Sequence, residues 1–324
     1  MTSLIEQAAR RLEQLRQAGV EVSAEAAVSL NKPSLPLSSD FLGTDAAALT
    51  GKLRPVVPSE VRSEPVAVQS RSIALDLDTL AASGIVSPHA PRSQIADQYR
   101  VIKRPLIKNA MGKGASVIAN GNLIMVTSAL PGEGKSFTAV NLAMSIATEL
   151  DNTVMLVDAD VARPSVMRML GLEAGPGLLD IVLDESRDLS SVLLKTNIDK
   201  LTILPSGTPH PRATELLASD AMVRLLEDMA NRYSDRIIVF DSPPLLITTE
   251  SRVLATHMGQ VVMVVQAGKT LQSEVRQALA TIDACPVRLM LLNKASSLFK
   301  GSYGYGYGYG RGYGYGHEQE RMQS

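Results

Sequence analysis

The sequence is poor in the residues that mark disulfide-stabilised, metal-binding or aromatic-rich proteins. Its 324 residues include one cysteine, no tryptophan, four phenylalanines and four histidines. The single cysteine, Cys285, excludes a disulfide within the chain and favours a reducing compartment. The histidines are scattered without metal-ligand spacing. Because six of the eight tyrosines fall between residues 303 and 315, the core must be aliphatic.

An excess of charge and long hydrophobic runs are lacking as well. The net charge is −1, so composition gives no argument for binding nucleic acid or an anionic membrane. No apolar run approaches the ~18 residues that span a bilayer, and the opening "MTSLIEQAARRLEQL" does not resemble a signal peptide. We therefore expect a cytoplasmic protein that meets a membrane only through a partner. With 45% apolar residues, the chain can form a sizeable core.

Four segments of different composition divide the chain. Residues 1–19 contain a predicted amphipathic helix that starts with a Ser3–Glu6 capping box. This helix is either weakly ordered or self-associating, or it docks on a partner, and its short apolar face disfavours membrane binding. Residues 20–90 are a proline-rich linker, in which "ALDLDTLAASG" is expected to form a short helix that docks on the following domain. Residues 91–295 form the domain, and residues 296–324 a flexible Gly/Tyr-rich tail.

Short apolar runs alternate with helical segments throughout the predicted domain. The runs are "NLIMVTS", "TVMLVDAD", "LTILPSG", "RIIVFDSPP", "QVVMVVQA" and "VRLMLLNK". Nearly unbroken β-branched runs indicate strands buried on both faces, and their alternation with helices predicts a mostly parallel sheet flanked by helices. The expected fold class is α/β, of the P-loop NTPase type. Ligands of such sheets bind at the carboxyl ends of the strands.

A phosphate-binding signature follows the first run, with one departure. "ALPGEGKSF" matches G-x-x-x-x-G-K-[ST], except that Ala129 replaces the first glycine. The preceding strand and following helix are the context that this motif requires, since backbone amides and the helix N-terminus then surround the phosphates. The predicted nucleotide-binding residues are Ala129, Leu130, Pro131, Gly132, Glu133, Gly134, Lys135, Ser136 and Phe137.

Acidic residues end two other runs. Asp158 and Asp160 close "MLVDAD", and Asp241 closes "IIVFD". Each aspartate alone is well explained as a helix N-cap. Carboxylates at the same sheet edge as a P-loop are unfavourable beside a triphosphate unless a cation lies between them. The set therefore predicts a site for ATP with Mg²⁺.

Together the three motifs resemble the bacterial tyrosine kinases (the BY-kinase family), which use a P-loop. The resemblance rests on Walker A (residues 129–136), the A′ motif (157–164) and Walker B (237–244), and it extends over about residues 85–295 plus the tyrosine-rich tail. It implies an ATP-dependent protein-tyrosine autokinase. Related positioning ATPases carry a second lysine directly after the first P-loop residue, where this chain has Leu130. A positioning-type ATPase that acts as a partner switch is the alternative function.

The resemblance also implies roles for single residues. Lys135 would bind the β and γ phosphates, and Ser136 and Asp160 would hold Mg²⁺, with Asp241 acting directly or through water. Asp158 would accept the proton of the tyrosine hydroxyl. In the A′ motif, Ala162 stands where the family usually has arginine, and Arg163 is the only arginine nearby. Asn293, after the last run, is a candidate adenine contact.

The tail supplies candidate phosphate acceptors. Its tyrosines alternate with glycines at Tyr303, Tyr305, Tyr307, Tyr309, Tyr313 and Tyr315. Alone, such a tract is typical of an adhesive segment or of one that stacks on nucleobases. Beside an ATP site, the same tract is predicted to be autophosphorylated, mostly between subunits. Each phosphate adds about −1.5 to −2 charge, so several would repel one another.

A helical segment before the first run contains a candidate oligomer interface. "QIADQYRVIKR" resembles the E-x-x-R-x-x-R motif of these kinases through Asp97, Arg100 and Lys103. Their i, i+3 spacing places them on one helix face, which is either a ring interface or a solvated charged face.

The resemblance further implies partners and a cellular role. The expected partners are other copies in a ring-like homo-oligomer, a membrane polysaccharide co-polymerase (chain-length determinant) as activator, and a protein-tyrosine phosphatase. The expected role is in exopolysaccharide biosynthesis and export, at the inner face of the membrane, as in the exosortase-associated subgroup. A nucleic-acid-binding function is disfavoured because the chain has no basic stripe.

Overall fold

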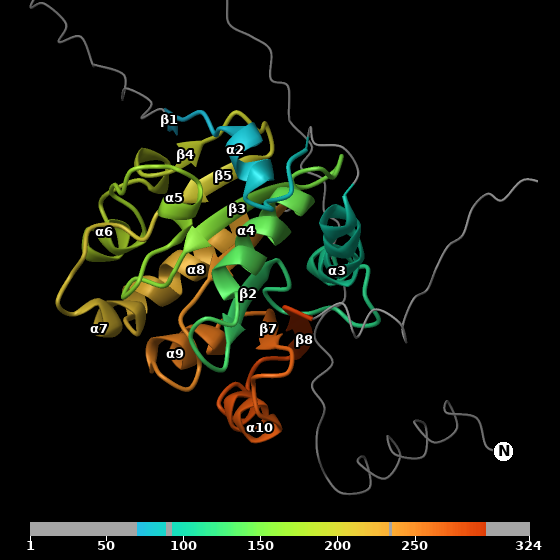
Figure 1. Cartoon of the computed structure of the whole chain (residues 1–324). Coiled ribbons are helices and arrows are strands. Elements are labelled where there is room, and N and C mark those ends of the chain that lie inside the picture. Colours follow the sequence, from blue (N-terminus) through green and yellow to red (C-terminus); the bar gives the residue numbers. More distant parts are fainter. Residues whose placement is uncertain (1–69, 89–92, 233–234, 296–324) are drawn as a thin grey trace, which may run out of the picture. The chain divides into compact units, whose positions relative to one another are not determined.

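The computed structural model describes residues 70–88, 93–232 and 235–295 (Figure 1). Eight strands in this part form one sheet in the order β1-β4-β5-β3-β6-β2-β7-β8. All neighbouring strands are parallel except β4 and β5, which are antiparallel. The predicted mostly parallel α/β sheet is therefore confirmed.

All six predicted strands are present. They are β2 (Leu123–Ser128), β3 (Thr153–Asp158), β5 (Leu201–Leu204), β6 (Arg236–Asp241), β7 (Gln260–Gln266) and β8 (Val287–Asn293). The central strands are buried along nearly their whole length, as their β-branched runs predict. The two-residue strands β1 (Arg71–Ser72) and β4 (Leu194–Lys195) were not predicted, because such short pieces leave no periodic pattern.

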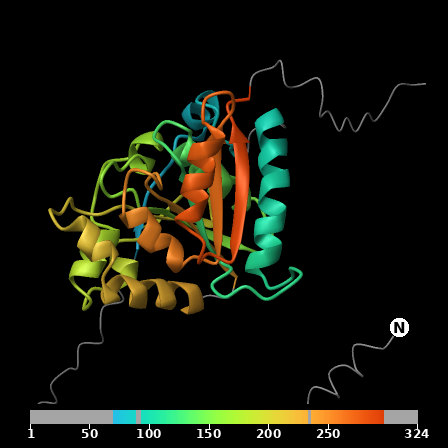
Figure 2. The same cartoon turned by 90° about the horizontal axis from the view of Figure 1, so that it is seen from below.

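The edge strand β8 differs from the prediction of burial on both faces. Its residues alternate between half-buried and exposed, and Met290 and Leu292 are 64% and 65% exposed. Figure 2 shows β8 at the border of the sheet beside α3 (Gln94–Ala110). Because no further strand covers this border in the described part, an unbroken apolar run here does not mean burial on both faces.

Helices cover both faces of the sheet and form two cores. On one face pack α2 (Leu77–Ala82), α3, α4 (Lys135–Ile146) and α5 (Val166–Met169). On the other face pack α6 (Leu178–Leu183), α7 (Ala213–Leu217), α8 (Asp220–Arg232), α9 (Glu250–Thr256) and α10 (Gln272–Ala280). Ala218 and Ser219 separate α7 from α8.

The segment just before residue 91 is part of the packed unit. The helix expected in "ALDLDTLAASG" is α2, capped by Asp76, and its Leu80 is buried together with Leu75, Ile85 and Val86 in the core beneath α4. The domain therefore extends at least to Arg71, where β1 pairs with β4. Residues 1–69 and 296–324, which contain the predicted N-terminal helix, most of the linker and the tail, lie outside the described residues.

The candidate oligomer-interface residues all lie on α3, but they do not share one exposed face. Asp97 and Arg100 are exposed and form an ion pair with each other. Lys103 is 2% exposed and turns inward, where its ammonium donates to the Ser145 carbonyl at the C-terminal end of α4 and pairs with Glu149 at 2.8 Å. A cation satisfies carbonyls at a helix C-terminus, so Lys103 is an internal cap and is removed from the interface candidates.

Replacing this internal cap is expected to destabilise the domain. Lys103→Met should lower the free energy of unfolding by about 2 kcal/mol, because charge-assisted hydrogen bonds are lost at a buried helix end. Urea unfolding measures this as a lower midpoint with an unchanged slope. Lys108→Met, at an exposed position of the same helix, is the matched control and should stay within about 0.5 kcal/mol. Equal effects of the two substitutions would contradict the capping role.

None of the helices in the described part combines the length and the apolar character that a bilayer-spanning helix needs.

Candidate functional site

The P-loop connects the end of β2 to the start of α4 (Figure 1). Gly132 and Gly134 have φ angles of +83° and +99°, which side chains rarely allow. Gly134 is the N-cap of α4, and Lys135 is the first residue of that helix. Backbone amides and the helix dipole therefore meet at this loop, as the signature predicts. Ala129, in place of the first glycine, is fully buried.

Glu133 holds the loop from inside. Its side chain is 2% exposed, and one carboxylate oxygen accepts the Leu130 N–H at 2.8 Å. The other oxygen accepts the hydroxyl hydrogen of Thr270, which lies between β7 and α10. Glu133 thus links the start of the P-loop at Leu130 to the segment that follows β7.

The end of β8 holds the loop from outside. The Asn293 amide donates to the Glu133 carbonyl at 2.9 Å, and Lys294 Nζ donates to the Gly132 carbonyl at 2.7 Å. Asn293, the candidate adenine contact, thus lies against the P-loop.

Strand pairing brings the acidic residues together. Asp158 and Asp241 are register partners on the adjacent parallel strands β3 and β6, so both side chains leave the sheet on the same face. Lys135 Nζ lies 2.6 Å from Asp160 Oδ2 and 3.8 Å from Asp241 Oδ1. One ammonium therefore pairs with two of the three predicted carboxylates, and the charge of the third, Asp158, also acts on it.

The raised carboxyl pKa values of this cluster reflect its burial first and its excess of negative charge second. Burial, with repulsion from Asp241, raises the pKa of the Asp158 carboxyl to about 7. Burial also raises the pKa of Asp241 to about 6, although the Lys135 ammonium opposes the rise. Burial by itself would lower the pKa of Lys135, but Asp241 and Asp160 outweigh it and raise that pKa. Lys135 thus stays charged. Its single positive charge is too little to balance the negative charge of the surrounding carboxylates.

The oxygens of the cluster differ in what they contact. Asp158 Oδ2 accepts the N–H groups of Ser165 and Val166 at 3.1 and 3.0 Å, so Asp158 caps the start of α5. Asp160 uses both oxygens, one on Lys135 and one on the Arg163 N–H. Asp158 Oδ1 and both oxygens of Asp241 are buried and have no hydrogen-bond partner among the described residues.

These uncommitted oxygens fit a divalent cation. Burying a carboxylate oxygen without a hydrogen-bond donor costs free energy, and a bound cation would offset that cost. No cluster of three His, Cys, Asp or Glu side chains in the described ranges is arranged to hold a metal unaided. Mg²⁺ beside a nucleotide commonly uses one or two carboxylates, a hydroxyl, phosphates and waters. Of the predicted donors, Asp241 has two uncommitted oxygens and Ser136 supplies a hydroxyl, whereas both Asp160 oxygens already accept hydrogen bonds, from Lys135 and from the Arg163 N–H.

A hollow of 360 Å³ opens directly beside this cluster. Lys135, Asp160 and Arg163 are among the residues that line it. Pro131, Pro243, Pro244 and Ile247 form the apolar remainder of the wall. In the sequence, the prolines stand out only as members of the Walker A and Walker B motifs. No sequence signal marks Ile247 as a residue of the site.

Not every predicted residue faces the site. The Phe137 side chain packs against the core on the α3 side of the sheet and borders a separate hollow with Tyr99 and Leu291, so only its backbone remains available to a nucleotide. Leu130, where positioning ATPases have a lysine, packs against the opposite core. The tail tyrosines lie outside the described residues.

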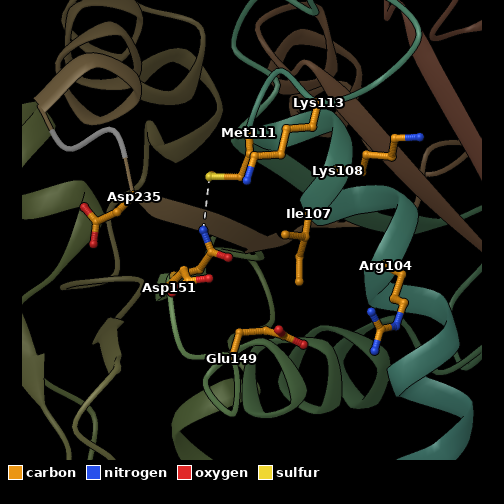
Figure 3. A pocket seen from close by; sticks show the side chains of 9 residues that line it. Arg104, Ile107, Lys108, Met111, Lys113, Glu149, Asp151 and Asp235 are labelled. Atoms are coloured by element: carbon orange, nitrogen blue, oxygen red, sulfur yellow. Dashed lines mark hydrogen bonds between the residues drawn. The ribbon is translucent and has the colours of Figure 1, made fainter.

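A larger hollow of 540 Å³ lies at the opposite ends of the strands (Figure 3). Arg104 and Lys108 on α3 face Glu149, Asp151 and Asp235 across it. It is remote from the P-loop, since Asp151 and Asp235 precede β3 and β6. Its size does not make it the chemical site, because the glycine loop, the ammonium and the uncommitted carboxylates are at the other end.

Comparisons with known proteins agree with this geometry. A family model described as ParA: NUBPL iron-transfer P-loop NTPase matches residues 120–207. The tyrosine-protein kinase YwqD of Bacillus subtilis is 32% identical over 206 residues, which cover 64% of this chain and 83% of that protein. The succinoglycan biosynthesis transport protein ExoP of Rhizobium meliloti is 31% identical over 219 residues, 66% of this chain but only 27% of that protein.

A solved structure of the chimerical protein CapA2B2 superimposes with a TM-score of 0.54 and 26% identity, covering 68% of this chain and 93% of that one. The ParA match covers residues 120–207, which include the P-loop and the A′ motif, whereas the match to YwqD covers 206 residues of this chain and 83% of that kinase. The chain therefore belongs to the bacterial tyrosine kinase family, the P-loop enzymes that phosphorylate protein tyrosines.

Proposed function

We propose that this chain is an ATP- and Mg²⁺-dependent kinase that phosphorylates its own C-terminal tyrosines, mostly between subunits. The observation that carries the proposal is the placement of Lys135 among Asp160, Asp241 and Asp158, beside an open apolar hollow. A hydrolytic switch needs the ammonium and the cation site.

The proposed roles follow from the contacts. Lys135 binds the β and γ phosphates, and Ser136, Asp160 and Asp241 hold Mg²⁺, which when bound neutralises phosphate charge. The phenol oxygen forms a bond to the γ-phosphorus, and the bond to the bridging oxygen breaks, so ADP leaves with that electron pair. We assign the phenol proton to Asp158, because its Oδ1 has no partner among the described residues, whereas both Asp160 oxygens are engaged.

Assembly and partners form a further part of the proposal. Asp97 and Arg100 are exposed on α3 and are candidates for contacts in a ring-like homo-oligomer. ExoP is named as a succinoglycan biosynthesis transport protein. This likeness supports a role in exopolysaccharide synthesis and export. We propose that the chain works at the inner membrane face, with a polysaccharide co-polymerase as activator and a protein-tyrosine phosphatase as antagonist.

The remaining segments have proposed roles of their own. Residues 1–19 would form a docking or self-associating helix, residues 20 to about 70 a linker, and residues 296–324 the autophosphorylated tail. The competing function, a positioning-type ATPase, is supported by the ParA match but requires the lysine that Leu130 replaces.

Removing the acceptors tests the proposal directly. Incubation with labelled ATP and Mg²⁺ should label the full chain and leave a chain ending at Lys300 unlabelled, because the truncation removes all six candidate tyrosines. ATP affinity of the truncated chain should be retained. Mass spectrometry should place phosphate between residues 303 and 315. ATP hydrolysis without any phosphotyrosine would favour the positioning ATPase instead.

A further inference from the structure

The edge strand β8 lacks the features that usually protect a sheet edge. Its seven residues pair with β7 on one side, and no strand of the described residues pairs with the other side. Such edges are normally protected by lysine, proline, a bulge or a covering segment, because their unpaired backbone groups can bind another chain. β8 contains neither lysine nor proline, its register with β7 runs without a bulge, and Met290 and Leu292 are 64% and 65% exposed. A covering segment is therefore expected.

A hollow with apolar lining lies on each flank of this edge. On the α3 side, which Figure 2 shows running beside β8, a hollow of 830 Å³ is lined in part by Ile95 and Leu291. On the α10 side, a hollow of 590 Å³ is lined in part by Val275 and Leu279. Leu292 contributes to both. A segment that paired with β8 would therefore find an apolar surface for both of its faces.

The backbone turns at the end of β8. Lys294 has a φ of +56°, a left-handed conformation that is uncommon for residues other than glycine and that occurs in the loops of β-hairpins. Two contacts hold it there, since its Nζ donates to the Gly132 carbonyl at 2.7 Å and its N–H donates to the Asn293 side-chain oxygen at 2.9 Å. Ala295, where the described residues end, lines the hollow on the α3 side. The chain therefore continues from the open edge itself, in a conformation suited to reversal.

The residues that follow lie outside the described part, and their sequence suits a covering strand. Leu298 and Phe299 are the only large apolar residues between Ala295 and the tyrosine tract. Successive side chains of a strand point to opposite faces, so this adjacent pair would place one side chain on each flank of β8. Leu298 follows Ala295 by three residues, a length of ~10 Å when extended, so the pair can reach the two hollows. Gly301 would end the added strand, because glycine weakens strand interiors.

We propose that residues 296–300 fold back on β8 as a further, antiparallel edge strand, with Leu298 and Phe299 covering its two flanks. This contact needs neither nucleotide nor phosphate. It has a consequence for the tail, and that consequence alone rests on the kinase function proposed above. Because β8 runs towards the sheet edge that carries the P-loop, a strand antiparallel to it leads away from that edge. Tyr303 is thus directed away from Lys135 of its own copy and becomes available to a neighbouring copy.

A single tryptophan reports the contact, because the chain has none of its own. In the full chain without ATP, Phe299→Trp should emit at shorter wavelength and lose most of its quenching by acrylamide, relative to Met322→Trp, which lies beyond the proposed strand. Emission and quenching equal to those of Met322→Trp would overturn the proposal. The signal should not change on dilution, and its loss on dilution would show that the segment binds another copy and does not fold back.

Substitution of the edge supplies the second arm. In the Phe299→Trp chain, Leu292→Ser should weaken the contact about tenfold, the effect of losing one buried aliphatic contact, and shift the emission towards that of Met322→Trp. Leu292 is largely exposed in the described part, so thermal unfolding of the domain should be unchanged. Leu150→Ser is the matched control, since Leu150 is 87% exposed between α4 and β3, and it should leave the emission unchanged. An emission that Leu292→Ser does not shift would contradict docking on β8.

The concentration dependence of autophosphorylation measures the consequence for the tail. The rate per molecule should rise with protein concentration in the unchanged chain. Leu298→Ser combined with Phe299→Ser should add a component that is independent of concentration, because the released tail can then reach the site of its own copy. Tryptophan signals as expected but no phosphotyrosine would support the contact and refute the kinase proposal alone. Phosphotyrosine formation without those signals would refute the contact alone.

Discussion

Lys135→Met is expected to reduce tyrosine autophosphorylation by about 10³-fold, the loss typical of removing a preorganised charge at a reacting group. The ammonium lies between Asp160 and Asp241, at 2.6 and 3.8 Å, and is the group that keeps these acids compatible with a triphosphate. Without it, the γ phosphate would meet three carboxylates with only the bound cation between them. Phosphotyrosine formed from labelled ATP over time measures the loss.

The fold should survive this substitution. Burial already raises the pKa of Asp241 to about 6, so the carboxyl can take up a proton when the ammonium is lost. Thermal unfolding checks this. Lys113→Met is the matched control, because Lys113 is exposed at the opposite ends of the strands, and its autophosphorylation should equal that of the unchanged chain. Full activity in Lys135→Met would remove the basis of the site assignment.

Gly134→Ala is expected to weaken nucleotide binding by roughly 30- to 150-fold, or about 2–3 kcal/mol. Gly134 has a φ of +99°, and a Cβ there would lie 2.2 Å from the Asn293 amide nitrogen. The added methyl group therefore strains the backbone and displaces the Asn293 contact with the Glu133 carbonyl, so the loop amides lose their orientation. Titration with a fluorescent ADP analogue gives the affinity.

Two further variants separate the effect of backbone strain at Gly134 from the effect of the clash with Asn293. Gly112→Ala is the control for backbone strain alone, because Gly112 has a φ of +63°, no atom within 4 Å of the added Cβ, and a position at the end of α3. It should leave the affinity unchanged. Asn293→Ala combined with Gly134→Ala removes the clash but keeps the strain, so the two substitutions should not be additive. Strict additivity would show that Asn293 and Gly134 act independently.

The positions of the nucleotide-binding groups could be predicted from the sequence because they follow from strand direction. In a parallel sheet the carboxyl ends of strands meet at one edge, so Ser128, Asp158 and Asp241 must lie near one another. What the sequence could not supply is the register and the order of the strands. Burial beneath the neighbouring segments is the main cause that raises both pKa values, and for Asp158 the charge of its register partner Asp241 adds to it.

Other features depend on neighbours that are distant in the sequence. Lys103 has the spacing of an interface residue, but α3 packs on the C-terminal end of α4 and turns its ammonium inward. Met290 and Leu292 have the pattern of a buried strand, but β8 lies at the edge of the sheet. Helical spacing shows which residues share a face, and it does not show what that face meets.

By itself, the sequence determined the α/β class, the glycine loop with its lysine, the acids at the strand ends and the tyrosines that follow the last strand. These are local matters of periodicity, chain direction and residue chemistry. Only the tertiary structure decided which carboxylate oxygens are left without donors and which side chains wall the hollow beside Lys135. Those properties arise where separate segments come within a few ångströms of each other, and lateral packing leaves no periodic trace along the chain.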